Sequence, residues 1–320
     1  MTKQKLLITR RLPDAIEARA LRDYEARLNR DDLAIAPDAI LAAAIGCDAL
    51  LCCTSDRLDA ATIARLPDSI KVIATFSAGT DHIDLKAAAG RGIPVCNTPD
   101  VLTEATAELS MLLILAAARR AGEGERMLRA GRWTGWAPTQ LMGTGVSGKR
   151  LGIFGMGRIG QALARMARGF RMEVHYRNRA RLCPEDEAGA TYHDNDGSFL
   201  AVSDVLALNA PGGASTRHWL NADRIAMLPR GCVVTNAARG TLVDDTALIA
   251  ALKSGRVAYA GLDVFEGEPS LNAEYLGLEN VVLLPHLGSA TAEARDAMGH
   301  LALDGVDAVL AGRVPGNLVG

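Results

Sequence analysis

The sequence lacks any large excess of charge of one sign. Its 35 lysines and arginines face 37 aspartates and glutamates, which gives a formal net charge of −2. A chain so balanced has no overall basic field for nucleic acid or an anionic membrane surface. The longest apolar run, MLLILAAA at 111–118, is too short to span a bilayer and predicts a buried helix. The first residues, MTKQKLLITRR, lack the apolar stretch of a signal peptide. We therefore expect a cytoplasmic protein with neither nucleic acid nor membrane as a partner.

Several chemical signatures are also missing. The six cysteines form no C-x-x-C pair, and we expect them to be free thiols in a reducing compartment. His193 with Asp194 and Asp196 has the spacing of no common metal site, so we expect a solvated loop and no metal. Neither the G-x-S-x-G elbow of an α/β-hydrolase nor a P-loop is present.

What the sequence does contain is an alternation of short apolar runs with longer helical patterns. The predicted strands are 5–9, 49–53, 71–77, 93–99, 150–154, 172–176, 205–209, 232–236, 258–264 and 281–285. The segment 13–28 between the first two reads as a helix. Continuous Val, Ile and Leu runs separated by helices are typical of parallel sheets covered on both faces. We therefore predict an α/β protein with two Rossmann-like, doubly wound domains and an active-site cleft between them.

The predicted helix at residues 101–120 separates the two blocks of strands. The last helix, residues 291–311, follows the end of the second block and has no further strand of that block to cover. We expect it to return to the first block. The predicted domains are a discontinuous substrate-binding domain, 1–99 with 288–320, and a dinucleotide-binding domain, 100–287.

Residues 150–170 contain the pattern G-x-G-x-x-G between a predicted strand and a predicted helix. The first glycine, Gly155, permits a tight turn; Gly157 lets the backbone approach a pyrophosphate; Gly160 lets helix and strand pack closely. The phosphates are expected against the helix N-terminus at Arg158 and Ile159. The alternative is a tight turn that binds no ligand.

The next predicted strand ends in an unusual way for a dinucleotide site. An acid that binds the ribose is expected there, but the residues are Arg177, Asn178 and Arg179. Glu173 begins the same strand, roughly 13 Å away at the opposite edge of the sheet. Arginine at this position accommodates the 2′-phosphate of NADP, so we predict NADP(H) as the preferred cofactor, with NAD(H) possible. The alternative is a solvated basic loop.

Three later segments place polar groups just beyond predicted strands. They are TNAARGTLVDD with Arg239, GLDVFEGEP with Asp263 and Glu268, and PHLGSAT with His286. Taken in order after the glycine turn, these motifs resemble the D-2-hydroxyacid dehydrogenase family over nearly the whole chain. The stretch from RWTGWAPTQLMGTG to the glycine turn is most similar to glyoxylate/hydroxypyruvate reductases.

The resemblance implies roles that the spacing alone does not give. Asp263 would hold the nicotinamide amide, and Thr106 would lie near the cofactor. Asn209, Ala237 and Gly288 complete the implied cofactor site. A homodimer is implied, with the helix at 101–120 and the tryptophan loop in its interface. Trp136 of that loop is expected among the substrate-binding residues, and the sequence does not decide whether Trp133 or Trp136 reaches a partner's active site.

The reacting groups can be argued from their chemistry. Reduction of a 2-keto acid needs a hydride at carbon and a proton at oxygen, and histidine suits the proton. We expect His286 to supply it, with Glu268 favouring the imidazolium. Arg239 is expected to hold the substrate carboxylate, together with backbone amides of Ala78 and Gly79.

Each of these roles has a structural alternative. Arg239 could pair with Asp244 or Asp245, Glu268 could be a surface acid, and His286 could be a hydrogen-bonded structural histidine. His82 is the competing histidine, which we expect to order the turn before a helix.

The predicted function is NADPH-dependent reduction of glyoxylate or hydroxypyruvate to the 2-hydroxy acid. Alternatives are a 2-ketogluconate-type reductase, an NAD-dependent D-glycerate dehydrogenase, and a dinucleotide-sensing protein similar to corepressors.

Overall fold

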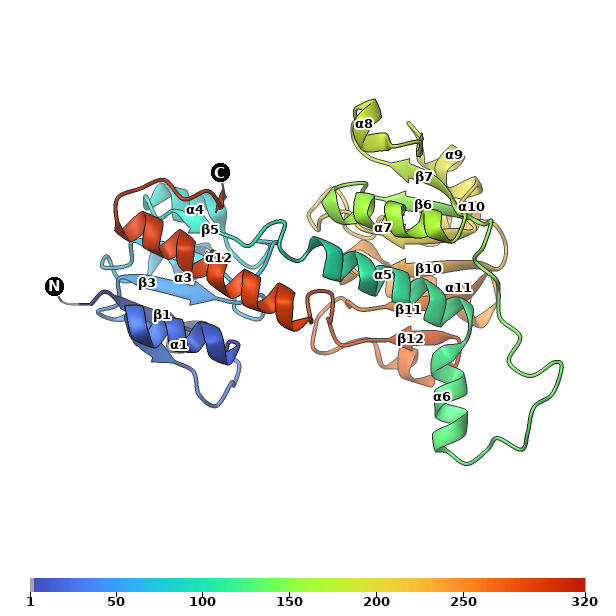
Figure 1. Ribbon diagram of the computed structural model, residues 1–320, viewed down its shortest axis with the longest axis horizontal. Helices are drawn as coiled ribbons and strands as arrows, with labels where there is room; N and C mark the ends of the chain where they lie inside the picture. Colours follow the sequence, from blue (N-terminus) through green and yellow to red (C-terminus); the bar gives the residue numbers. More distant parts are fainter. Residues whose placement is uncertain (1–2, 320) are drawn as a thin grey trace. The chain divides into compact units, whose positions relative to one another are not determined.

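The computed structural model describes residues 3–319. By their contacts the residues divide into two compact units (Figure 1). The first unit takes in the ranges Met1–Leu102 and Ser289–Gly320, and the second is Thr103–Gly288. Each unit contains one sheet covered by helices on both faces, so the expected α/β class with two doubly wound domains is confirmed. The domain limits 1–99 with 288–320 and 100–287 remain our proposal.

The first unit is built on a six-stranded sheet in the order β13-β5-β4-β3-β1-β2. All neighbouring strands are parallel except β13, which pairs antiparallel with β5. The strands are β1 Lys5–Ile8, β2 Glu25–Leu28, β3 Ala49–Cys52, β4 Val72–Thr75, β5 Val95–Cys96 and β13 Leu318–Val319. The helices are α1 Asp14–Asp23, α2 Pro37–Ala44, α3 Ala60–Ala64, α4 Leu85–Gly90 and α12 Ala292–Leu310.

Side chains along each strand alternate between the two faces of this sheet. Leu6 and Ile8 of β1 point into a core shared with α1 and α12, whereas Leu7 points into a core shared with α2, α3 and α4. Gly299 of α12 packs closely on α1, since a Cβ there would lie 2.4 Å from the Ile16 side chain. The last helix therefore packs on one face of the first sheet.

The helix expected over residues 13–28 is shorter than predicted. It ends at Asp23, and residues 25–28 form the edge strand β2 instead. These residues, EARL, have good helix propensity. They pair in parallel register with β1, however, and Tyr24 is buried against α12, where its hydroxyl bonds to Asp307. Tertiary pairing outweighs local propensity here.

The second unit contains a seven-stranded, wholly parallel sheet in the order β12-β11-β10-β9-β6-β7-β8. Its strands are β6 Arg150–Phe154, β7 Glu173–Arg177, β8 Thr191–Tyr192, β9 Val205–Leu208, β10 Cys232–Asn236, β11 Val257–Leu262 and β12 Val281–Leu283. Its helices are α5 Thr103–Ala118, α6 Ala121–Arg129, α7 Arg158–Gly169, α8 Pro184–Glu187, α9 Asp196–Ala201, α10 Ala222–Met227 and α11 Asp245–Lys253, with 3₁₀ turns at Gly240–Leu242 and Ala273–Gly277.

The chain order of this sheet reverses between β6 and β9. From β6 the chain builds outward through β7 and β8, then returns to β9 and continues through β10 to β12. In open α/β sheets, ligands bind beyond the carboxyl ends of the strands at such a switch point. The glycine turn lies at the end of β6, one of the two strands at this point.

α6 and the loop after it stand away from the packed elements of the second unit (Figure 1). No residue of α6 is buried, and the loop after it exposes Trp133 and Trp136. Arg126 ties α6 to the sheet through an ion pair of 2.6 Å with Glu279, just before β12. Within residues 3–319, no helix is both long and apolar enough to cross a membrane.

Candidate active site

The three glycines of the turn after β6 have different surroundings. Gly155 has φ +97°, and a Cβ there would lie 2.4 Å from the Ala210 nitrogen. A Cβ on Gly160 would lie 2.6 Å from the Gly155 carbonyl oxygen. A Cβ on Gly157 would meet nothing within 4 Å. The outer two glycines are therefore required by packing, while the middle one leaves its backbone open, as the approach of a pyrophosphate needs.

The groups around this turn fit a dinucleotide. α7 begins at Arg158, so the first N–H groups of the helix, including that of Ile159, have no partner within the helix. Asn209 follows β9, and its amide donates to the Phe154 carbonyl at 2.8 Å. The side-chain oxygen of Asn209 is buried and, among the described residues, has no hydrogen-bond partner. A buried acceptor without a partner is costly, and a donor on a bound ligand removes that cost.

Asn178 interacts with the glycine turn itself. Its side-chain oxygen accepts the amide of Met156 at 2.7 Å, and its side-chain nitrogen lies 3.4 Å from the Met156 carbonyl. Met156 stands between the first two glycines. Asn178 therefore fixes the shape of the turn from the end of β7, a role that its place in the sequence did not indicate.

The three arginines of the stretch 177–181 have three different environments. Arg177 lies with its Nε 3.3 Å from Asp196 and donates through Nη1 to the Asn178 carbonyl. Arg181 forms two hydrogen bonds with Glu187, of 2.7 and 3.0 Å. Arg179 is exposed, and within the described part of the chain it has neither a hydrogen bond nor an ion pair. Arg177 and Arg179 thus remain the candidates for a 2′-phosphate, whereas Arg181 anchors α8.

His286 and Glu268 form a close pair after β12 and β11. Nδ1 of His286 lies 2.7 Å from one oxygen of Glu268, and the other oxygen accepts the Phe265 amide at 2.7 Å. Burial raises the pKa of Glu268. The hydrogen bonds from His286 and Phe265 and the charges of His286 and Arg239 outweigh burial and hold this pKa below its ordinary value. Glu268 is therefore a carboxylate at neutral pH, and a carboxylate can only accept, so the proton of this bond lies on Nδ1.

Asp263 fixes the backbone that carries His286. It is fully buried, and its two oxygens accept the amides of Leu287 and Gly288 at 2.7 and 2.9 Å. Its own carbonyl accepts the His286 amide at 2.8 Å. Burial raises the pKa of Asp263, and the two amide bonds and the charge of His286 oppose that rise. A Cβ on Gly288 would lie 3.4 Å from the Thr106 side chain, so Thr106 of α5, Asp263 and Gly288 meet in one place.

Arg239 lies just beyond β10 in a tightly held turn. The Asn236 side chain donates to the Arg239 carbonyl at 2.8 Å and accepts the Ala238 amide at 3.0 Å. A Cβ on Gly240 would lie 1.9 Å from the Phe265 carbonyl carbon, so the turn packs directly on the loop that holds Glu268. The structure thus brings Arg239 close enough to lower the pKa of Glu268.

Asp244 and Asp245, which the sequence offered as ion-pair partners of Arg239, make other contacts. Asp244 accepts the Ala247 amide at 3.2 Å and caps α11, and Asp245 accepts the Tyr275 hydroxyl at 2.8 Å. Ala237 lies between Asn236 and Arg239, half-buried. Asn236 was not among the residues expected in the site, although the stretch TNAARGTLVDD contains it.

A second histidine–glutamate pair was not predicted from the sequence. His218 lies 2.7 Å from Glu266, and Arg217 lies 2.5 Å from the same carboxylate. The His218 amide donates to the Thr241 carbonyl at 2.7 Å. This cluster ties residues 217–218 to the loop that carries Glu268. No spacing in the sequence relates His218 to Glu266, which are 48 residues apart.

Two further predicted substrate residues, Ala78 and Gly79, belong to the first unit, whereas Trp136 lies in the second. Ala78 and Gly79 follow β4, where the Asn97 side chain donates to the Ala78 carbonyl at 2.7 Å and the Ser77 hydroxyl to that of Gly79 at 2.7 Å. His82 lies 2.9 Å from the Thr75 hydroxyl through its Nε2. The role expected for His82, ordering the turn before a helix, stays a prediction.

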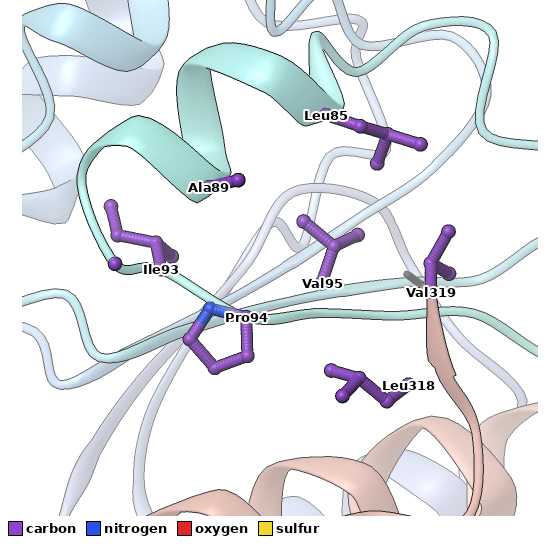
Figure 2. Close-up of a pocket in the computed structure, with 8 residues that line it drawn as sticks. Leu85, Ala89, Ile93, Pro94, Val95, Leu318 and Val319 are labelled. Atoms are coloured by element: carbon purple, nitrogen blue, oxygen red, sulfur yellow. The ribbon is translucent and has the colours of Figure 1, made fainter.

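His193 and one apolar pocket are further places where a functional site could be sought. His193 contacts His175 and Ser198, each at 3.0 Å, and no three potential ligands within the described residues are grouped to hold a metal ion. The pocket in Figure 2 lies in the first unit, has a volume of about 260 Å³ and is lined by Leu85, Ala89, Gly92, Ile93, Pro94, Val95, Leu318 and Val319. Its lining carries no side chain that could perform chemistry.

A parallel sheet with a dinucleotide-type glycine turn, and a histidine paired with a carboxylate beside an arginine, define an NAD(P)-binding oxidoreductase. Residues 111–288 match the family described as D-isomer specific 2-hydroxyacid dehydrogenase, NAD binding domain. The chain belongs to the D-isomer specific 2-hydroxyacid dehydrogenase family, which confirms the resemblance seen in the motifs.

Relatives along the full length of the chain are known. A glycerate dehydrogenase of Hyphomicrobium methylovorum is 48% identical over 98% of both chains. A glyoxylate reductase of Thermococcus litoralis is 42% identical over 99% of this chain and 97% of its own. The solved structure of an NADPH-dependent glyoxylate/hydroxypyruvate reductase from Sinorhizobium meliloti, in complex with NADP and malonate, has a TM-score of 0.89 and 32% identity, covering 100% of this chain and 97% of that one.

Proposed function

We propose that the protein reduces glyoxylate or hydroxypyruvate to the 2-hydroxy acid and prefers NADPH as the cofactor. The observation that carries this proposal is the His286–Glu268 pair of 2.7 Å, held in the same unit as Arg239 and the glycine turn. The names of the Thermococcus and Sinorhizobium relatives support the substrate class.

His286 acts as the proton donor in this proposal. Its Nδ1 proton is engaged by Glu268, so Nε2 is the nitrogen that faces the substrate oxygen and gives up its proton during reduction. In the oxidative direction the same nitrogen accepts the proton. The nicotinamide, when bound, supplies or accepts the hydride.

Arg239 binds the substrate carboxylate, because a guanidinium matches a carboxylate with two parallel donors. Asn236 and the close packing of Gly240 on Phe265 fix the backbone from which it reaches. We keep the amides of Ala78 and Gly79 as further carboxylate donors, as proposed from the sequence.

For the cofactor, Gly155, Gly157 and Gly160 with the start of α7 would hold the pyrophosphate. Asn209 offers its buried acceptor, and Ala237, Thr106 and Gly288 would line the site. Asp263 has further lone pairs on both oxygens for the nicotinamide amide, since two carboxylate oxygens offer about four acceptor positions. Arg177 and Arg179 support the preference for NADPH.

The runner-up is an NAD-dependent D-glycerate dehydrogenase. The name of the Hyphomicrobium relative favours it, as does the carboxylate of Asp196 beside Arg177. The same residues serve either direction, so the two proposals differ in cofactor and in the direction of flux.

Steady-state turnover with glyoxylate, hydroxypyruvate and a 2-ketogluconate, each with NADPH and with NADH, tests the proposal. We expect the highest kcat/KM for glyoxylate or hydroxypyruvate with NADPH. Highest activity on the sugar acid would favour the longer-chain reductase. Binding of cofactor without turnover of any keto acid would favour a dinucleotide-sensing protein instead.

We also propose a cytoplasmic homodimer in which α5 and the tryptophan loop meet a second copy. Trp136 is 81% and Trp133 52% exposed, and α6 buries none of its residues. Large exposed aromatic side chains are typical of interfaces. Sedimentation at micromolar concentration should give a dimer, and Trp136→Ser should weaken it; a wild-type monomer would contradict the proposal.

A further inference from the structure

Asp196, the first residue of α9, receives three donors from three parts of the second unit. One oxygen lies 3.3 Å from Nε of Arg177 at the end of β7. The other oxygen lies 2.7 Å from Nε of Arg224 in α10 and 3.2 Å from Nε1 of Trp219. The sequence had placed this residue only in a solvated loop. Its carboxylate is instead the shared partner of two guanidinium groups.

The surroundings of Asp196 fix its position. Trp219 is buried and stacks on Phe154, the last residue of β6, with ring centroids 3.6 Å apart and planes 9° from parallel. Arg224 lies over the Trp219 ring at 5.3 Å and donates to the Trp219 carbonyl at 3.0 Å. A carboxylate held by this packed group cannot turn away when a ligand arrives.

Arg177 is therefore only partly available to a ligand. Its Nε is directed at Asp196 and its Nη1 at the Asn178 carbonyl. Among the described residues, only its Nη2 has no hydrogen-bond partner. An ion pair lowers the positive potential that Arg177 presents, and the same carboxylate repels any anion placed next to it.

A ribose 2′-hydroxyl and a 2′-phosphate respond differently to this arrangement. The phosphate carries close to two negative charges at neutral pH. It gains from Arg177 and loses to Asp196, whereas the neutral hydroxyl is not repelled by the carboxylate and can donate a hydrogen bond to it. We propose that Asp196 is a specificity-determining residue that weakens the discrimination between the two cofactors and keeps NAD(H) usable. This inference rests on the proposed NADPH-dependent function and deepens it.

The test replaces Asp196 with asparagine, which keeps an acceptor for Arg177 but removes the charge. Calorimetry measures the dissociation constants of NADP⁺ and NAD⁺ at low and high salt, a readout independent of turnover. We expect the affinity ratio of NADP⁺ to NAD⁺ to rise about 3- to 10-fold at low salt, and the gain to shrink at high salt because the pocket is partly open.

The matched control is Asp194→Asn, which removes one charge from the same loop. Asp194 is exposed and accepts only from the Asn195 side chain among the described residues. We expect its ratio to stay at the wild-type value. An unchanged or lower ratio in Asp196→Asn, or an equal rise in Asp194→Asn, would overturn the inference.

Arg224→Gln provides a second variant if Asp196→Asn does not fold, as judged by its thermal transition. Without Arg224, the negative charge of Asp196 is no longer offset by a second guanidinium and acts more strongly at Arg177. The ratio of NADP⁺ to NAD⁺ affinity should therefore fall, and an unchanged ratio would overturn the inference. The proposed cofactor preference fails separately, if the wild-type protein binds NAD⁺ more tightly. In that case a rise in Asp196→Asn would still support the role of Asp196.

Discussion

Nδ1 of His286 lies 2.7 Å from Oε2 of Glu268, while Oε1 of the same carboxylate accepts the Phe265 amide at 2.7 Å. Both oxygens of Glu268 are thus used to fix one imidazole. The bond to Nδ1 sets which nitrogen is left for the substrate, and the carboxylate stabilises the imidazolium.

Replacing His286 with alanine should lower kcat for keto-acid reduction by on the order of 10² to 10⁴. The side chain supplies the proton, and the glycine turn is untouched, so the dissociation constant of NADPH should change little. His82→Ala is the comparison variant, because His82 contacts Thr75 in the first unit. The assignment is wrong if His286→Ala turns over normally or if only His82→Ala loses turnover.

Glu268→Gln should change the pH profile of the reaction. Reduction needs the protonated imidazole, so its rate falls as pH rises, while oxidation of the hydroxy acid shows the opposite limb. The pKa of Glu268 is lowered, so its charge is present throughout the neutral range and favours the imidazolium. Without that charge, reduction should begin to lose rate at a lower pH than in the wild type. An unmoved profile would show that Glu268 is only a surface acid.

Asp263→Asn should slow turnover and lower the melting temperature together. Asparagine offers one acceptor oxygen where the Leu287 and Gly288 amides need two, and an unsatisfied buried donor costs about 1–3 kcal/mol. The backbone that carries His286 would shift as a result. Asp245→Asn is the matched control, since Asp245 bonds to Tyr275 rather than to this loop. We expect the control to lose stability but keep its kcat; equal loss of kcat in both would contradict the positioning role.

The basic stretch after β7 is anchored by Glu187, which makes a pH-dependent contribution to stability. The hydrogen bond from Arg181, joined by that from Tyr176, lowers the pKa of Glu187 to about 2, against the effect of burial. Because this pKa is lower in the folded state, the stabilisation is fully present above about pH 4.3, the ordinary glutamate value. It is lost as pH falls towards 2.

Glu187→Gln should therefore unfold at a lower denaturant midpoint than the wild type at pH 7, and the two midpoints should converge below about pH 4. The measurement is chemical denaturation across this pH range, with Glu185→Gln as the control, because Glu185 is an exposed residue of the same helix. A gap between wild type and Glu187→Gln that stays constant down to pH 2 would contradict the assignment.

Much of the architecture could be predicted from the sequence because buried parallel strands consist of continuous apolar runs. Strands such as β9, VLAL, are fully buried and unmistakable. β2 was missed because its residues, EARL, lie at a sheet edge and have helical propensity; only pairing with β1 makes them a strand. Short strands β8 and β13, of two residues each, carry no periodic signal.

Some features of the candidate site could likewise be predicted from the sequence, and others could not. His286, Glu268 and Arg239 could be proposed because each directly follows a strand, and parallel strands end at one edge of their sheet. The contact of Asn178 with Met156 and the attachment of Arg177 to Asp196 could not, since a side chain's partner depends on packing between distant segments. A basic stretch in a sequence does not reveal which of its arginines are already paired.

The central claim is tested most directly by the ratio of kcat/KM for NADPH and NADH with saturating glyoxylate. A hydrogen bond to a charged group contributes roughly 1.5–3 kcal/mol, and screening together with Asp196 reduces what Arg177 and Arg179 deliver. We expect NADPH to be favoured about 10- to 100-fold, since about 1.4 kcal/mol corresponds to tenfold. Replacing Arg177 with aspartate and Arg179 with a neutral residue should reverse the preference. Equal values for the two cofactors, or a higher value for NADH, in the unmodified protein would contradict the account.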